Sequence, residues 1–136
     1  MLPKKLRHKY DTVFIDPPYT INGIRVVLQR ALEALKLEEN KKIYLCYSTM
    51  DLSNSSLIEL QKHFLRKGLL IKEILPKFNS YRETKPMKDE LKMVGYSPKR
   101  NWFVSSLIRL STTNLQKKER LLNTGYYNIY KYEKKK

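Results

Sequence analysis

Cysteine and glycine are scarce in this sequence, and their scarcity limits the kinds of site that it can build. Cys46 is the only cysteine, so neither an intrachain disulfide nor a cysteine-based zinc site can form. It lies in an apolar segment, where we expect a small core residue rather than a nucleophile. The four glycines form no Gly-x-Gly turn after a strand, and open α/β folds use such a turn to hold a nucleoside cofactor. We therefore expect the chain by itself to lack the cofactor half of such a site.

Long apolar runs are also missing. No run approaches the roughly 20 residues that a membrane helix needs, and the basic residues 1–9 are not followed by an apolar stretch of signal-peptide type. We therefore expect a cytoplasmic protein with no membrane partner. The 136 residues are 41% hydrophobic and 30% charged, which is typical of one soluble globular domain.

Acidic residues are few, with 13 Asp and Glu against 28 Lys and Arg, and the net charge is +15. Much of the positive charge lies at the two ends, and residues 116–136 are also rich in tyrosine. Basic ends often bind nucleic acid or another acidic surface, and as often they are only solvated. We predict one domain over residues 1–115 and a basic, Tyr-rich C-terminal tail over residues 116–136.

One stretch combines a strand with a turn that can carry chemistry. Residues 12–15 form a short apolar run rich in β-branched and aromatic side chains, which predicts a buried strand. Asp16 follows it, and Pro17 and Pro18 stop the strand because proline has no N–H and a locked φ. Ligands of open α/β sheets bind beyond the carboxyl ends of strands, which is where Asp16 and the ring of Tyr19 lie. An ordinary turn is the alternative, since Asp before Pro favours turn initiation.

The rest of the chain alternates amphipathic helices with apolar strands, the pattern of a parallel α/β sheet. Residues 76–100 show no period, and a connection of that length is usually functional or mobile. We predict strands over 11–15, 42–47, 69–75 and 101–110, helices over 23–37 and 54–67 with caps at Thr20 or Asn22 and at Ser53 or Asn54, and a short helix over 87–93.

The sequence Asp-Pro-Pro-Tyr after a Val-Phe-Ile strand resembles motif IV of amino-methyltransferases with the class I methyltransferase fold. Those enzymes act on exocyclic amines of adenine or cytosine. The order of predicted elements matches the second part of that fold. The resemblance therefore implies an α/β fold that is the C-terminal half of a class I methyltransferase-like, Rossmann-like sheet, mostly parallel with a last antiparallel hairpin.

Downstream motifs distinguish the families that share this turn. The segment from Asp16 to Thr20 is followed by a helix, a strand and a second helix, then by Phe78-Asn79-x-Tyr81, and later by Asn101-Trp102-Phe103-Val104-Ser105-Ser106. This order resembles the C-terminal catalytic part of N4-bis(aminopropyl)spermidine synthases, the branched-chain polyamine synthases of thermophiles, over about residues 2–112. That family's winged-helix-like domain, glycine-rich cofactor motif and aspartate-rich motif have no counterpart in this sequence.

The resemblance implies aminopropyl transfer from decarboxylated S-adenosylmethionine to the central, secondary amine of spermidine, without a metal. The transfer needs a neutral amine aimed at the carbon beside a sulfonium, and a positioned carboxylate can orient the amine and accept its proton. Asp16 is therefore the candidate catalytic residue. Glu83, Asp89 and Glu90 are candidates for holding a cationic polyamine tail. The candidate substrate-binding residues are Pro17, Tyr19, Thr20, Asn79, Tyr81 and Trp102.

Two other functions stay open. In a fragment of a nucleic-acid amino-methyltransferase, Asp16 and Pro17 would accept hydrogen bonds from the target amine and Tyr19 would stack on a flipped base. The net charge favours this alternative, since a strongly basic chain repels a polycation. A non-catalytic remnant or a partner-dependent subunit is the third possibility. An open sheet edge pairs readily with other chains, so we expect a homo-oligomer or a missing N-terminal half as the partner.

Overall fold

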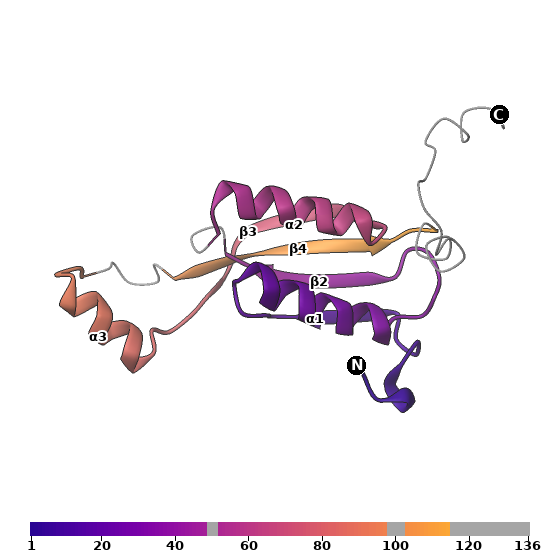
Figure 1. The fold of residues 1–136 in the computed structure, drawn as a ribbon, viewed down its shortest axis with the longest axis horizontal. Helices are drawn as coiled ribbons and strands as arrows, with labels where there is room; N and C mark the ends of the chain where they lie inside the picture. Colours follow the sequence, from indigo (N-terminus) through magenta and orange to yellow (C-terminus); the bar gives the residue numbers. More distant parts are fainter. Residues whose placement is uncertain (49–51, 98–102, 115–136) are drawn as a thin grey trace.

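The computed structural model describes residues 1–48, 52–97 and 103–114. In these residues the chain forms an α/β fold with one four-stranded sheet (Figure 1). None of the helices described is long and apolar enough to cross a membrane. The elements in chain order are a 3-10 helix at Lys4–Leu6, β1 at Thr12–Ile15, α1 at Ile21–Ala34, β2 at Lys42–Tyr47, α2 at Asn54–Arg66, β3 at Leu69–Ser80, α3 at Lys85–Met93 and β4 at Val104–Thr112.

The sheet is mixed, with the strand order β1-β2-β4-β3. β1 and β2 pair in parallel, whereas β4 lies between β2 and β3 and is antiparallel to both. The prediction of a mostly parallel sheet is therefore wrong for the pairing, because the last strand inserts between two strands that run the other way. It is right for direction, since β1, β2 and β3 all point the same way. The antiparallel pairing of the last two strands is confirmed.

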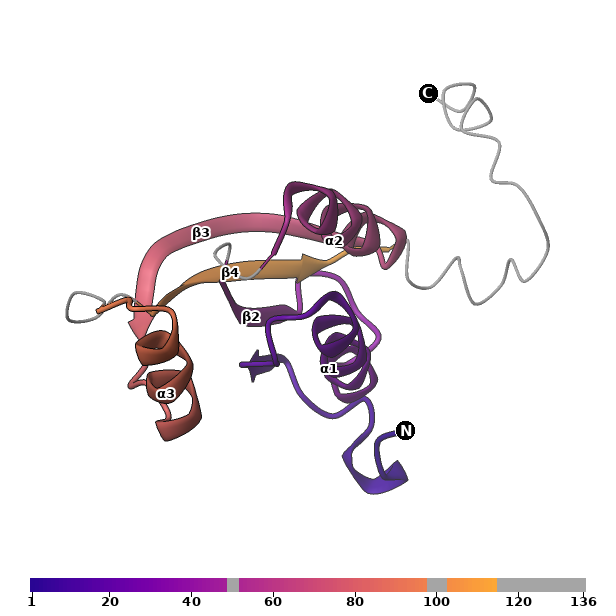
Figure 2. The same ribbon diagram turned by 60° about the vertical axis from the view of Figure 1, so that its left-hand side comes forward.

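The hydrophobic core lies between the sheet and two helices. α1 and α2 cover the same face of the sheet (Figure 2), each with an apolar stripe at helical spacing. In the residues described, no helix packs on the opposite face, and α3 stands away from the sheet with no buried side chain. The buried core residues include Ile24 and Leu28 of α1, Leu60 and Phe64 of α2, Ile43 and Leu45 of β2, and Ile108 and Leu110 of β4.

The helix ends follow from local hydrogen bonds. The Thr20 side chain accepts a hydrogen bond from the Gly23 N–H and caps α1, so the helix starts two residues before its predicted start. α1 also ends before the predicted residue 37, because Leu35 leaves the helix to form a bridge with Tyr10. α2 is capped by Ser53, as expected.

β3 is longer than predicted. The predicted strand ends at Leu75, because residues 76–100 show no period, but β3 continues to Ser80 through an irregularity between Leu75 and Asn79. Lys77, inside this irregularity, has a φ of 51°. β3 is an edge strand, and edges and bulges are where a sheet tolerates proline. The bulge carries the chain on to Asn79 and Tyr81.

Candidate functional site

Polar residues that are far apart in the sequence lie close together at one end of the sheet, the carboxyl end of the parallel strands. β1, β2 and β3 stop at this end, and the antiparallel β4 begins there. Asp16 directly follows β1, and Asn79 and Tyr81 lie at the end of β3. Asn79 pairs in register with Ser105 at the start of β4. The carboxyl end of the parallel strands is thus the candidate site, as the position rule for open α/β sheets predicts.

Tyr81 is at the centre of the hydrogen bonds at this end of the sheet. Its hydroxyl oxygen lies 3.0 Å from both carboxylate oxygens of Asp16 and 2.6 Å from the hydroxyl oxygen of Tyr19. It also lies 3.2 Å from Ser105 Oγ and 3.4 Å from Asn79 Nδ2. Each phenol has one proton, so a consistent assignment has Tyr19 donating to Tyr81 and Tyr81 donating to Asp16. We call these five residues the Tyr81 cluster.

Tyr19 stays a neutral phenol in this cluster. Burial raises its pKa well above the ordinary value of 10, and the hydrogen bond with Tyr81 and the charge of Asp16 act in the same direction, while Ser105 opposes them. A phenol with a raised pKa keeps its proton at neutral pH and remains a donor. The cluster therefore presents a single carboxylate backed by neutral hydroxyls.

Three aromatic rings form a wall beside the carboxylate. The ring of Tyr19 meets the rings of Tyr81 and Phe103 edge-on, with centroids 6.1 and 6.2 Å apart. The rings of Tyr81 and Phe103 are tilted, with centroids 5.3 Å apart. Aromatic pairs in these arrangements stabilise each other and leave faces for a flat or apolar ligand.

Asp16 itself is exposed. An ionised carboxylate offers about four lone-pair positions, and the hydroxyls of Tyr81 and Tyr19 approach one side of it. Positions that face solvent remain for a ligand. The arrangement can orient an amine, accept its hydrogen bond and take up its proton.

The other predicted site residues have different surroundings. Pro17 is buried, so it shapes the turn. The Thr20 hydroxyl is used as the cap of α1. Trp102, and the Asn101 that precedes it, lie outside the residues that the structure describes. Asp89 and Glu90 are exposed on α3.

Sequence reasoning missed three members of the site. Ser105 and Phe103 were noted only as part of a motif, and Cys46 was expected in the core. Cys46 is indeed fully buried, but it also accepts a hydrogen bond from Asn79 Nδ2 at 3.4 Å. Burial and the charge of Asp16 raise the pKa of the Cys46 thiol, which argues against a thiolate nucleophile. No signal in the sequence singles out Ser105, because β4 also holds Ser106, Arg109 and Ser111.

A metal centre has no ligand set in the part of the chain described. Within residues 1–48, 52–97 and 103–114, no group of three or more His, Cys, Asp or Glu side chains lies close enough together to hold an ion.

These features define an α/β protein with one carboxylate and an aromatic wall at the carboxyl end of its sheet. The chain belongs to the family described as the branched-chain polyamine synthase A C-terminal domain, which it matches over residues 1–133. This confirms the resemblance drawn from the sequence.

Curated relatives agree with this assignment. The chain is 30% identical to the N(4)-bis(aminopropyl)spermidine synthase of Thermococcus kodakarensis over 118 residues, which are 82% of this chain and 33% of the relative. It is 36% identical to an uncharacterized protein of Methanocaldococcus jannaschii over 80 residues, which are 59% of this chain and 19% of that protein. The chain thus spans a third or less of the length of these relatives.

A solved structure has a similar fold. The branched-chain polyamine synthase of Thermus thermophilus, in complex with N4-aminopropylspermidine and 5'-methylthioadenosine, superimposes with a TM-score of 0.72 at 25% sequence identity. The match covers 82% of this chain and 33% of that one. The α/β fold seen here is therefore shared with part of that enzyme.

Proposed function

We propose that this chain supplies the acceptor side of a site that transfers aminopropyl groups from decarboxylated S-adenosylmethionine to the secondary amine of spermidine. The observation that carries the proposal is the exposed Asp16 carboxylate, hydrogen-bonded by Tyr81 at the carboxyl end of β1. The solved relative binds a branched polyamine and 5'-methylthioadenosine. The second compound is the thioether that remains when decarboxylated S-adenosylmethionine gives up its aminopropyl group.

The proposed step forms one C–N bond and breaks one C–S bond. The lone pair of the neutral amine attacks the carbon beside the sulfonium, and the electrons of the broken bond stay on sulfur, which becomes a thioether. In the first transfer, Asp16 accepts a hydrogen bond from the secondary amine, aims its lone pair and takes up the proton that the new ammonium releases. The second transfer turns the resulting tertiary amine into a quaternary ammonium and releases no proton. Tyr81 holds the carboxylate in place, and the ring of Tyr19 walls the substrate.

We further propose that the sheet is the C-terminal half of a class I methyltransferase-like, Rossmann-like sheet. The position of β1 supports this, because it is an edge strand with one side unpaired. The uncovered face also leaves Phe14 of β1 57% exposed. A glycine-rich nucleoside turn is absent from this sequence, so we assign that half of the site to a partner surface, either another part of the enzyme or another chain.

The unpaired side of β1 favours a second candidate function: a chain that acts only with a partner. Unpaired strand edges associate with other strands, and exposed apolar side chains mark interfaces when they form a patch. Methyl transfer to nucleic acid has less support, because the named relatives make polyamines. Sedimentation of the isolated chain tests the partner: a stable monomer would count against it.

The experiment for aminopropyl transfer uses the protein as isolated from its own cells, with any chain that copurifies. It is incubated with spermidine and decarboxylated S-adenosylmethionine, and the polyamines are weighed by mass spectrometry. We expect the addition of one and then two aminopropyl groups. A parallel incubation with S-adenosylmethionine and DNA should give no methylated base; methylated DNA without branched polyamine would overturn the proposal.

The matched variants are Asp16→Asn and Glu39→Gln. The first removes the proton acceptor and should lower the rate by roughly 10²–10⁴-fold. The second changes an exposed carboxylate in the connector between α1 and β2 and should leave the rate unchanged. Equal rates for both variants would assign Asp16 a merely structural role.

A further inference from the structure

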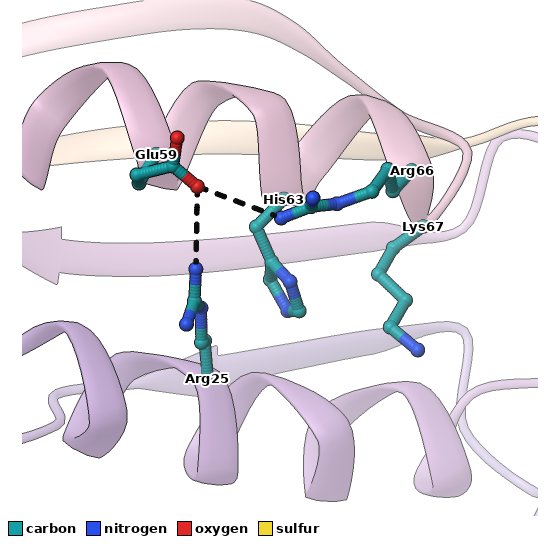
Figure 3. Close-up of a pocket in the computed structure, with 5 residues that line it drawn as sticks. All are labelled: Arg25, Glu59, His63, Arg66 and Lys67. Carbon is teal, nitrogen blue, oxygen red and sulfur yellow. Dashed lines mark ion pairs between the residues drawn. The ribbon is translucent and has the colours of Figure 1, made fainter.

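A polar cavity lies between α1 and α2, and none of the residues that line it belongs to the Tyr81 cluster. Its volume is about 540 Å³. Figure 3 shows Arg25 reaching up from α1 toward α2, and the other lining residues come from α2 and the residue that follows it. Those residues are Glu59, His63, Arg66 and Lys67.

The cavity lining has more positive than negative charge. Arg25, Arg66 and Lys67 are cations, and Glu59 is the only carboxylate among the five lining residues. Glu59 Oε2 lies 3.8 Å from Arg25 Nη2 and 3.9 Å from Arg66 Nη2, so both ion pairs are longer than a hydrogen bond. Its other oxygen lies 3.0 Å from Lys62 Nζ. One carboxylate is thus shared among three cations.

Arg25 also has an unused donor. Its Nε is buried, and no hydrogen-bond acceptor lies near it in the residues described. Buried N–H groups in folded proteins are almost always paired. A guanidinium has five donors in a planar fork that suits an oxyanion, above all a phosphate. Because Nε itself is shielded, an oxyanion in the cavity would meet the other donors of this fork, on a side chain that is 34% exposed.

The basic residues at the end of α2 have a simpler explanation than ligand binding. Cations in the last turn of a helix interact favourably with its free carbonyl groups, so Arg66 and Lys67 alone define nothing. Arg25 lies in the first half of another helix, where that explanation does not apply. Because Arg25 lines the same cavity, the preference of a helix end for cations does not explain the whole set of basic residues.

We propose that the cavity between α1 and α2 binds phosphate groups, with Arg25 and Arg66 holding oxygens from opposite walls. Its two arginines, one on each helix, can hold the oxygens of two linked phosphates at once. The phosphates can belong to a free polyphosphate compound or to the backbone of a nucleic acid. The proposal does not depend on aminopropyl transfer, since no residue of the Tyr81 cluster takes part.

His63 is a built-in reporter of occupancy. Burial lowers its pKa, and Arg25, Lys67 and Arg66 lower it further. Glu59, one turn before it on α2, is the carboxylate facing the same cavity. A bound phosphate adds negative charge beside the imidazole, so it favours the protonated ring and raises the pKa of His63. His8 is the internal control, because its ring contacts the Leu35 carbonyl and neither residue lines this cavity.

The experiment follows both imidazoles of the full chain by NMR through a pH titration. Inorganic pyrophosphate is added at constant ionic strength, with potassium chloride as the reference. We expect the pKa of His63 to rise by roughly 1 and that of His8 to stay unchanged. The Arg25→Gln variant should weaken pyrophosphate binding by at least about tenfold. Arg30→Gln, which alters an arginine of α1 paired with Glu33 at 2.7 Å, should bind normally.

A short RNA oligonucleotide in a second titration distinguishes the sources of the phosphate. A shift of His63 with pyrophosphate supports a free polyphosphate ligand, and a salt-sensitive shift with RNA alone supports backbone phosphates. If neither probe moves His63 beyond the chloride reference, the basic residues are only solvated and the proposal is overturned. A full shift in Arg25→Gln overturns it as well.

Discussion

The hydroxyl oxygen of Tyr81 lies 3.0 Å from both carboxylate oxygens of Asp16, although 65 positions separate the two residues in the chain. One comes from the turn after the first strand and the other from the end of an edge strand. Their contact exists because β1 and β3 run the same way, so that both strands end at one edge. The hydroxyl thus fixes a carboxylate that solvent would otherwise leave mobile.

Removing that hydroxyl tests whether it positions Asp16. Tyr81→Phe keeps the ring beside Phe103 and loses the hydrogen bonds to Asp16 and Tyr19. We expect the rate of aminopropyl transfer to fall by about 10–100-fold, with a loss of only about 1 kcal/mol in unfolding free energy. Tyr96→Phe, which changes an exposed tyrosine past the end of α3, is the control. An unchanged rate and pH profile in Tyr81→Phe would show that Asp16 needs no support.

Gly23 is a second point where the turn is fixed. A Cβ at this position would lie 2.8 Å from the Pro18 carbonyl oxygen and 2.9 Å from Thr20 Oγ1. Alanine normally favours a helix over glycine by about 1 kcal/mol, but here it must push back the turn that holds Asp16. We expect Gly23→Ala to lose about 1–3 kcal/mol of unfolding free energy in urea. Asn22→Ala, exposed in the same turn of α1, should change it by less than about 0.5 kcal/mol. A stabilised Gly23→Ala would show that the turn adapts freely.

Local features of this chain were predictable from residue patterns, whereas the one non-local pairing that was predicted, between the last two strands, came from the family resemblance. Asp16 and Tyr19 were identified from the sequence because a strand, two prolines and an aromatic lie within a few residues. Ser105 was missed because it reaches the site only when β4 inserts between β2 and β3. Pattern along one segment cannot show which strands will be neighbours.

The end of β3 gives a second example. The prediction ended this strand at Leu75, where the period is lost, and it failed because an edge strand with a bulge accommodates Pro76 and continues to Ser80. Asn79 and Tyr81 were nevertheless found, and they came from the family motif rather than from the strand pattern. Propensity rules state what a residue prefers, whereas pairing across the sheet decides what it does.

The core between the sheet and α2 predicts a large contrast between two adjacent residues. Phe64 is 2% exposed in the core, while Leu65, the next residue on the helix, is 65% exposed. Phe64→Ala should cost about 3–5 kcal/mol of unfolding free energy, because it leaves a cavity. Leu65→Ala should cost less than about 0.5 kcal/mol. Urea unfolding measures both, and similar losses would mean that α2 is turned differently on the sheet.

The last prediction concerns acid stability and Asp11. Its two carboxylate oxygens each lie 2.8 Å from an ammonium group, one from Lys36 and the other from Lys41. These hydrogen bonds lower the pKa of Asp11 from its ordinary 3.8 to about 2. A carboxylate whose pKa is depressed in the folded state stabilises the fold above its unfolded pKa, and this contribution is lost as the pH falls through the folded value.

Asp11→Asn should therefore lower the melting temperature near neutral pH, and the difference from the parent should shrink as the pH falls from 3.8 toward about 2. The Asp11 carboxylate is 58% exposed, so salt at about 1 M should also reduce the difference. Glu39→Gln removes a charge from the connector between α1 and β2, which also carries Lys36 and Lys41. Glu39 makes no ion pair in the residues described, so this variant should show neither trend. A difference that persists unchanged below pH 2 would mean that Asp11 acts through packing, because a protonated carboxyl makes no ion pair.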